Sequence, residues 1–184
     1  QLFLQQGFDA TTMRQIGQAA HVTTGSLYHF FEHKDAIFLE IVREVFAVAD
    51  TLARQTLHND PDPYLNRMLE LGVQLKTAFS NDAIAGLYLA AHHSATVTGF
   101  ILETATARNR QLFGQLNLDE ADLHLRTLLI KGCLTALIEQ RVHSRDVALE
   151  LSLRHLLPLA CHLFGLPDEQ IGGRVARALE KLLD

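Results

Sequence analysis

Apolar residues recur at helical spacing along nearly the whole chain, and no segment sustains the strict alternation of a half-buried strand. Pro61 and Pro63 stand too close together for one helix to run through both, so the pattern breaks there. We therefore predict an all-α protein. The expected helices cover the tail of a first helix that stops at Gly7, then 12–20, 24–31, a long one from Lys34 through Ala53, 63–80, 82–94, 96–114, 119–142, 145–164 and 168–183.

Composition limits the function classes without choosing among them. The 184 residues are 48% hydrophobic, enough for a substantial core, and the net charge of −5 is not that of a protein that coats nucleic acid. Cys133 and Cys161 lie in apolar stretches and are expected to be core residues in a reducing, cytoplasmic setting. No apolar run is long enough to predict a membrane span. Gln1 opens inside an apolar pattern, and we expect the first turns of a longer protein to precede it.

The most informative stretch is residues 11–34, which read TTMRQIGQAAHVTTGSLYHFFEHK. Thr12 followed by Gln15 is the pattern of a capping box that starts a helix. Small apolar residues suited to a close helix crossing follow, and Val22 is expected to seal a tight turn. The crossing residues are Ile16, Ala19 and Ala20.

A second short helix should begin after this turn, with Thr23 as its N-cap. Leu27, Phe30 and Phe31 are expected to form its buried side. Its outer face then carries short polar or aromatic residues with no acidic group, as a helix in the major groove requires. These outer residues are Thr24, Gly25, Ser26, Tyr28 and His29.

Residues 2–42 resemble the DNA-binding region of tetracycline-repressor (TetR) family regulators. The shared elements include Gly7-Phe8, Thr11-Thr12, Gly25, Leu27-Tyr28 and a lysine that opens the next long helix. The resemblance implies a three-helix DNA-binding unit at 1–46 and a larger helical effector-binding and dimerisation domain at 47–184. It also implies that the operator-contacting residues are Thr12, Arg14, Thr23, Thr24, Gly25, Ser26, Tyr28, His29 and Lys34.

Within this set, Arg14, Thr24 and Ser26 are the expected base readers, and the remaining side chains are expected at or near phosphates. Two features depart from the simplest expectation. His21 stands where the family usually has Gly, so a left-handed turn residue would be strained. Residues 1–46 hold three basic and five acidic side chains, which favours few phosphate contacts.

The resemblance also implies a cavity for a small, largely apolar effector in the helical body. The segment from about 79 to 113 mixes aromatic and polar residues among aliphatic ones, as such a wall would. Core packing is the alternative for each single residue. The candidate effector-binding residues are Phe79, Tyr88, His92, Thr96, Phe100, Thr104 and Phe113.

The expected helices 119–142 and 145–164 are apolar on more than one side, so each should pack on its own core and on a partner. We therefore predict a homodimer that binds a near-palindromic double-stranded DNA operator. Gly132 would permit a close helix crossing, and Pro158 should kink the second helix. The candidate interface residues are Leu134, Leu137, Ile138, Leu156 and Leu157.

Other chemistries find little support in the sequence. Adjacent His92 and His93 point about 100° apart on a helix and suit no single metal ion, so no metal site or other cofactor is expected. No nucleophile elbow, phosphate loop or paired carboxylates predict an enzyme. The leading prediction is a repressor that a small molecule releases from DNA. The alternative is a helical ligand-carrier or protein-interaction module that does not bind DNA.

Overall fold

The computed structural model describes residues 1–57, 60–144 and 146–183, with side chains from 48 to 57 left aside. Over these residues the all-α prediction is confirmed. The predicted helix boundaries agree with the structure within a few residues. The helices are α1 Leu2–Gln6, α2 Met13–Ala19, α3 Thr24–Phe30, α4 Lys34–Leu57, α5 Pro63–Ser80, α6 Asp82–His93, α7 Ala95–Phe113, α8 Glu120–Ser144, α9 Leu149–Leu163 and α10 Asp168–Leu183, with a 3-10 turn at Gly114–Leu116.

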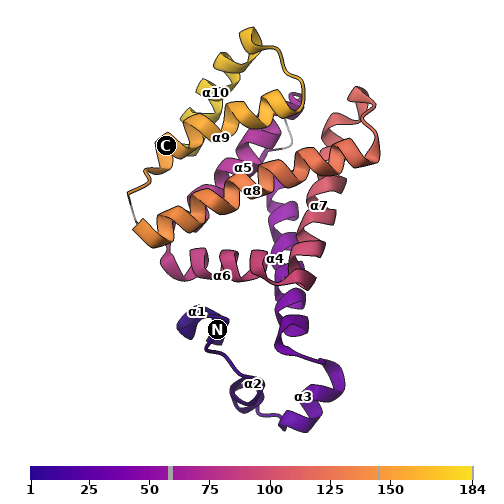
Figure 1. Ribbon diagram of the computed structural model, residues 1–184, viewed down its shortest axis with the longest axis vertical. Helices are drawn as coiled ribbons and strands as arrows, with labels where there is room; N and C mark the ends of the chain where they lie inside the picture. The colour runs from indigo at the N-terminus through magenta and orange to yellow at the C-terminus, as the bar shows by residue number, and fades with distance from the viewer. Residues whose placement is uncertain (58–59, 145, 184) are drawn as a thin grey trace.

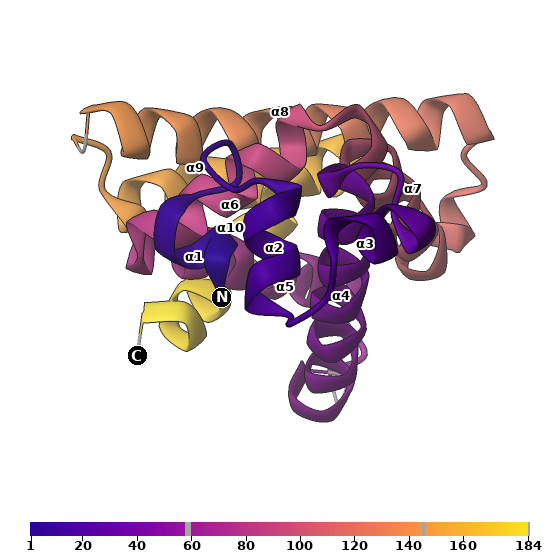
Figure 2. The ribbon, with the colours of Figure 1, turned by 90° about the horizontal axis from the view of Figure 1, so that it is seen from below.

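The three short helices form one end of the molecule and the long helices form a body at the other. Figure 1 shows α2 and α3 at the bottom, α4 rising from them, and α9 and α10 at the top. Seen from below in Figure 2, α1, α2 and α3 face the viewer together. Helix α4 therefore joins the small unit to the body, which it contacts along α7.

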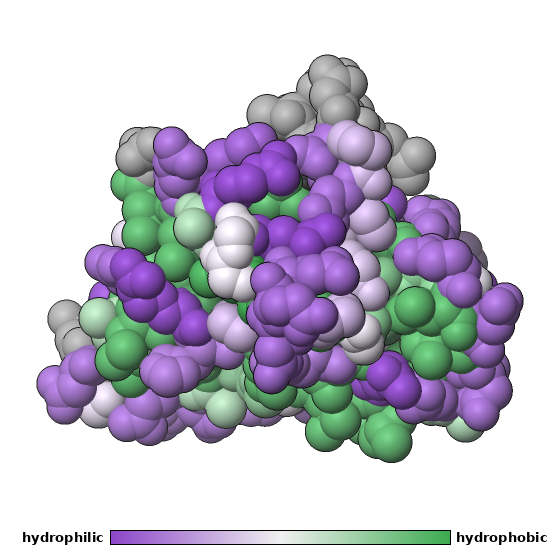
Figure 3. All heavy atoms as spheres, turned by 90° about the horizontal axis from the view of Figure 1, so that it is seen from above, coloured by the Kyte–Doolittle hydropathy of each residue, from purple (hydrophilic) through white to green (hydrophobic). Residues whose placement is uncertain are grey.

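The body has its own apolar core, formed mainly by α5, α8, α9 and α10. Leu65, Leu75, Ile138 and Leu157 are fully buried in it. Helices α5 and α10 cross so closely that a Cβ added to Gly72 would lie 2.1 Å from the Cδ1 atom of Leu182. Gly72 therefore sets the spacing of this pair. Figure 3 shows hydrophilic residues over much of this end, with hydrophobic atoms gathered along its lower edge, the side on which α8 lies.

A second apolar core joins the small unit to the body. Phe3 and Phe38 pack edge to face with ring centroids 5.3 Å apart, and Phe8 lies 4.7 Å from Phe38. The same cluster includes Val97 and Ile101 of α7. The DNA-binding unit and the body thus share buried surface, and the predicted division at residue 46 stays a prediction.

Several packing predictions for the two short helices are wrong. Phe30 is 77% exposed instead of buried, because α3 packs through Leu27 alone among its fully buried positions. Ala19 and Ala20 are exposed, and α2 buries Met13 and Gly17 in their place. Predictions for Ala49, Leu52 and Ala53 lie outside the described side chains, and those for Asn59 and Arg145 lie outside the described residues.

Candidate nucleic-acid interface and interior polar cluster

The start of α2 is held by the predicted capping box. The Gln15 amide nitrogen donates to Thr12 Oγ1 over 3.3 Å, and the Thr12 amide donates to Gln15 Oε1 over 2.8 Å. Gln6 of α1 adds a third link, because its Nε2 also donates to Gln15 Oε1. Arg14 follows on the exposed side of the helix. The first turn of α2 thus presents free backbone donors and a cation at the surface.

The turn between α2 and α3 is tight. His21 has a φ of 56°, the left-handed conformation expected to strain a non-glycine residue there. The Val22 amide donates to the Gly17 carbonyl over 2.9 Å. A Cβ on Gly17 would lie 3.1 Å from the Val22 carbonyl oxygen, so the close approach depends on glycine. Val22 itself is 44% exposed and does not seal the turn as predicted.

Helix α3 begins at the predicted N-cap, where Thr23 Oγ1 accepts from the Ser26 amide over 3.0 Å. Its outer face is open to solvent: Gly25, Ser26 and His29 are exposed, and Tyr28 is 54% exposed. Thr24 is half-buried. The described side chains of α3 include no acidic group, so this face can approach a polyanion without repulsion.

Lys34 lies differently from the phosphate contact that the resemblance implies. Its Nζ donates to the carbonyl oxygens of Phe8, Asp9 and Thr11 over 2.6, 3.2 and 3.1 Å. The ammonium also lies 4.2 Å from the centroid of the Phe8 ring. Its donors are therefore engaged in holding the α1–α2 connection on the start of α4.

Two contacts link the DNA-binding unit to the junction of α6 and α7. The Ser94 hydroxyl donates to Asp35 Oδ1 over 2.7 Å. Phe46 packs against Phe100 edge to face with centroids 5.9 Å apart, and the Arg43 guanidinium lies 5.3 Å from the Phe100 ring. A displacement of α6 or α7 would consequently act on α4, which carries α3 at its base.

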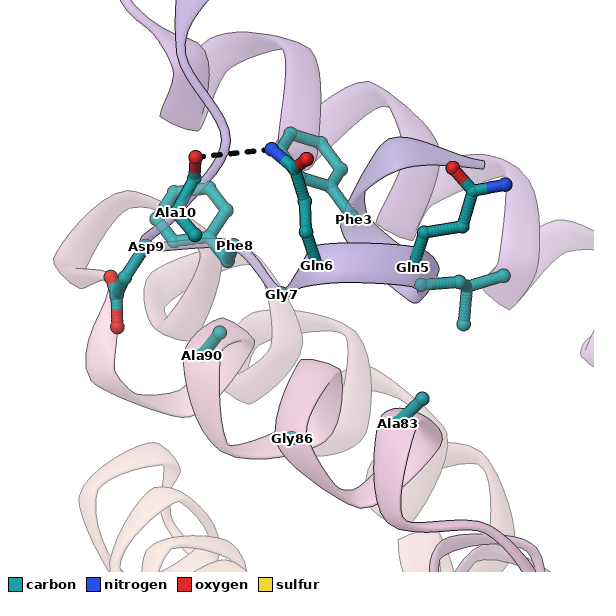
Figure 4. A pocket seen from close by; sticks show the side chains of 11 residues that line it. Phe3, Gln5, Gln6, Gly7, Phe8, Asp9, Ala10, Ala83, Gly86 and Ala90 are labelled. Carbon is teal, nitrogen blue, oxygen red and sulfur yellow. Dashed lines mark hydrogen bonds between the residues drawn. The ribbon is translucent and has the colours of Figure 1, made fainter.

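A cleft of about 440 Å³ lies between the two units. Figure 4 shows Phe3, Gln6 and Phe8 on its α1 side and Ala83 and Gly86 on α6, with the Gln6 side chain bonded to the Ala10 carbonyl. Its walls are mostly backbone and small side chains. No residue of the predicted effector set lines this cleft.

Inside the body, Tyr88 and His92 are stacked with ring centroids 4.0 Å apart. His92 Nδ1 lies 2.7 Å from the Tyr88 carbonyl oxygen, which can only accept, so Nδ1 carries the proton. His92 Nε2 is then a buried acceptor, and it has no hydrogen-bond partner. Burial lowers the pKa of His92 to about 4 and raises that of Tyr88, so His92 is neutral at pH 7.

Next to this pair, three charged side chains meet in the interior. Arg67 of α5 is 6% exposed, and its Nη1 lies 3.3 Å from Glu70 Oε2. Arg108 of α7 donates twice to Glu70 Oε1, over 2.9 and 2.6 Å. The Nε atom of Arg67 is buried without a partner. Sequence reasoning missed these residues, although an arginine on the apolar face of YLNRMLELG was a usable signal.

The structure brings together only part of the predicted effector set. Tyr88 and His92 are adjacent, and Phe113 lines a narrow space that Arg67 also lines. Phe79 lies elsewhere, 5.9 Å from the Arg141 guanidinium, and Phe100 faces α4. The prediction also included Thr96, which is exposed at the start of α7, and Thr104, which is half-buried.

Helices α8 and α9 each have an outward face that the body does not cover. The predicted interface residues are not on it: Leu134, Ile138, Leu156 and Leu157 are buried in this chain's own core, and Leu137 is partly buried against it. Side chains that pack inward cannot form a second contact without opening the core. The exposed leucines are instead Leu125, Leu128 and Leu129 of α8 and Leu151 and Leu159 of α9.

Two surveys of the described residues returned nothing. They hold no group of three or more His, Cys, Asp or Glu side chains placed to share a metal ion. They also hold no helix with the length and apolar character needed to cross a membrane.

Comparison with known proteins identifies the N-terminal region. Residues 1–41 match the family model described as "Bacterial regulatory proteins, tetR family". The chain is 48% identical over 42 residues to the HTH-type transcriptional repressor KstR2 of Rhodococcus jostii, covering 23% of this chain and 21% of the relative. It is 31% identical over 85 residues to the repressor AcnR of Corynebacterium efficiens, covering 41% and 45%.

A solved structure is similar over more of the chain but less closely. It is Thermus thermophilus FadR, a TetR-family transcriptional repressor in complex with lauroyl-CoA. The match has 24% identity and a TM-score of 0.44, and it covers 99% of this chain and 88% of that one. The chain spans less than half the length of the curated relatives it matches.

Proposed function

We propose that this chain, whose residues 1–41 belong to the tetR family of bacterial regulatory proteins, is a DNA-binding transcriptional repressor that a small molecule releases from its operator. The observation that carries the proposal is the exposed outer face of α3. That face presents Ser26, Tyr28 and His29 at one end of the molecule, with no acidic side chain on the helix. The relatives are named as repressors, which supports a regulator instead of an enzyme.

Arg14 and the capped start of α2 complete the proposed interface. Arg14 is exposed, and the first turn of α2 offers backbone amides to a phosphate. Thr23 contributes through its cap, because its hydroxyl fixes the Ser26 amide and side chain. Thr24 and Ser26 would then read base edges while Tyr28 contacts the sugar-phosphate backbone.

The repressor would act as a homodimer on a near-palindromic operator. Leu128 and Leu129 of α8 and Leu151 and Leu159 of α9 form the apolar face that supports this proposal. Two copies packed through α8 and α9 would bury these leucines in a self-complementary contact. Their α3 helices would then have to lie about 34 Å apart to reach successive major grooves.

Release by an effector requires a route from the body to α3. The proposed route runs through α6, whose C-terminal residue His93 precedes Ser94, and from Ser94 to Asp35 at the start of α4. A ligand that favours one position of α6 would shift the separation of the two α3 helices. Such a shift needs only a difference in ligand affinity between the two arrangements.

The test is DNA binding measured over a range of salt concentrations. Binding-site selection on random duplexes should return a motif with two-fold symmetry. Arg14→Gln should lower the salt slope by about one unit, and Tyr28→Ala should weaken binding to all sequences alike. Arg154→Gln, on the exposed side of α9 next to Glu150, is the matched control and should leave the slope unchanged. Absence of any salt-dependent duplex binding would refute the proposal.

The second candidate is a ligand carrier of the same fold that does not bind DNA. It is favoured by the excess of acidic over basic side chains in residues 1–46. A carrier would bind its small molecule with full affinity while showing no duplex binding at low salt. The same titration therefore separates the two functions.

A further inference from the structure

The interior of the body holds more positive than negative charge. Arg67 and Arg108 both pair with Glu70, and no second carboxylate is paired with either arginine among the described residues. The three side chains are all mostly shielded, with exposed fractions of 8%, 13% and 19% for Arg67, Glu70 and Arg108. Two guanidinium groups thus share one carboxylate inside the protein.

This arrangement is unfavourable as it stands. A buried charge without a full complement of partners costs several kcal/mol in typical proteins. Arg67 makes a single hydrogen bond at the long distance of 3.3 Å, and its Nε is buried without an acceptor. Burial and the neighbouring Arg108 both lower the pKa of Arg67, which shows how weakly the charge is compensated.

Arg67 also borders a space that is apolar elsewhere. Tyr64, Met68, Phe113 and Cys161 line it together with Arg67, and its volume is about 140 Å³. The space is subdivided so finely that no water-sized molecule fits inside. A guanidinium facing a closed apolar space has no water available to satisfy it.

We propose that Arg67 is the anion anchor of the effector site, and that the effector is a small organic carboxylate with an apolar body. The proposal rests on the proposed function and names the ligand class for it. The carboxylate would accept from Arg67 Nε and supply the negative charge that the cluster lacks. The apolar body would enter the space bordered by Tyr64, Phe113 and Cys161.

The neighbours of Arg67 provide the response. Tyr88 lies near enough to Arg67 for their charges to interact, and it is stacked on His92 one turn along α6. The Thr98 hydroxyl donates to the His92 carbonyl over 2.7 Å, close to the Ser94 contact with α4. Because the space is closed, a ligand must displace its lining side chains, and displacement of Tyr88 acts on this end of α6.

The experiment compares carboxylates with neutral amides of the same shape. The full chain is titrated calorimetrically with phenylacetate and phenylacetamide, and with decanoate and decanamide. The carboxylates should bind at least about tenfold more tightly than their amides, since a hydrogen bond to a charged group contributes ~1.5–3 kcal/mol. Equal affinities within each pair, or no binding by either carboxylate, would overturn the proposal.

Two variants of opposite sign test the role of Arg67. Arg67→Met should remove the preference for carboxylates without lowering the melting temperature, because Glu70 and Arg108 remain as a balanced pair. Glu70→Gln should tighten carboxylate binding, because it removes the competing anion, and it keeps the test decisive if Arg67→Met does not fold. Arg154→Met is the surface control and should change neither value.

Duplex binding by the same samples separates this inference from the proposed function. A protein that prefers carboxylates through Arg67 but never binds DNA would refute the repressor and keep the anion site. A protein that binds DNA but keeps its carboxylate preference in Arg67→Met would refute the anion site and keep the repressor.

Discussion

The Ser94 hydroxyl lies 2.7 Å from Asp35 Oδ1 and ties the α6–α7 junction to the first turn of α4. Ser94 also caps α7, so the same side chain serves the body and the DNA-binding unit. Because α4 starts directly after the α3 connection, this bond sits where a movement of the body would reach the DNA-reading helix.

We predict a measurable coupling between Asp35 and Ser94. A double-mutant cycle with Asp35→Ala, Ser94→Ala and the double variant should give a coupling energy of ~1.5–3 kcal/mol in the free energy of unfolding, as for other hydrogen bonds to a charged group. Urea titrations monitored by circular dichroism provide the values. A cycle between Asp35 and the distant Thr127 is the control and should show simple additivity.

Lys34 should act on stability and not on the salt dependence of DNA binding. Lys34→Met leaves three carbonyl oxygens without their donor, at a cost of about 1–3 kcal/mol in the free energy of unfolding. Since its ammonium is engaged within the protein, the salt slope of duplex binding should not change. A slope reduced by one unit in a fully folded Lys34→Met protein would restore the phosphate contact that the family resemblance implies.

The outward leucines of α8 and α9 should carry the dimer. Leu128→Glu places a charge on an exposed apolar face and should give monomers with much weaker operator binding. Analytical ultracentrifugation at micromolar concentration measures the change. Val73→Glu, at an equally exposed apolar position on α5, is the matched control and should leave the assembly intact. A wild-type protein that sediments as a monomer would contradict the prediction.

Stability should fall in mild acid because of His92. Its pKa is about 4 in the folded protein and 6.5 as the ordinary value, so the unfolded chain binds more protons between these limits. The free energy of unfolding should therefore drop as the pH falls from 6.5 towards 4, by up to about 3 kcal/mol from this group. His92→Gln should lack that component, so the difference between the two proteins in urea titrations at pH 7 and pH 5 isolates it. Parallel losses in both proteins would assign the acid sensitivity to other groups.

Sequence patterns predicted the helices well because most of their signals are local. Thr12, Gln15 and Thr23 act within one turn of themselves, and their capping bonds are present as expected. Phe30 was assigned to the wrong side because which face of a seven-residue helix is buried depends on the helices around it. The DNA-contacting roles of the exposed residues stay predictions.

Contacts between distant segments were beyond the sequence. Gly132 was expected to mark a close crossing, yet a Cβ there would meet no atom of this chain within 4 Å, whereas Gly72 meets Leu182, which lies far along the chain. Arg67 and Arg108 converge on Glu70 from α5 and α7, a meeting that no local pattern encodes. The outward leucines on α8 were missed for the same reason, since periodicity shows that a helix is apolar on two sides but not which side faces inward.

The aromatic contact of Phe3 and Phe8 with Phe38, continued by Val97 and Ile101 of α7, limits how such a protein can be recombined. A DNA-reading head taken from a relative would bring its own version of these rings, and they would meet an α7 surface shaped for different partners. Exchange of operator specificity between regulators should therefore succeed when the junction follows α7 contacts, and fail when it is drawn at a residue number in α4. For gene-circuit engineering, the transferable part is the head together with the body residues that touch it.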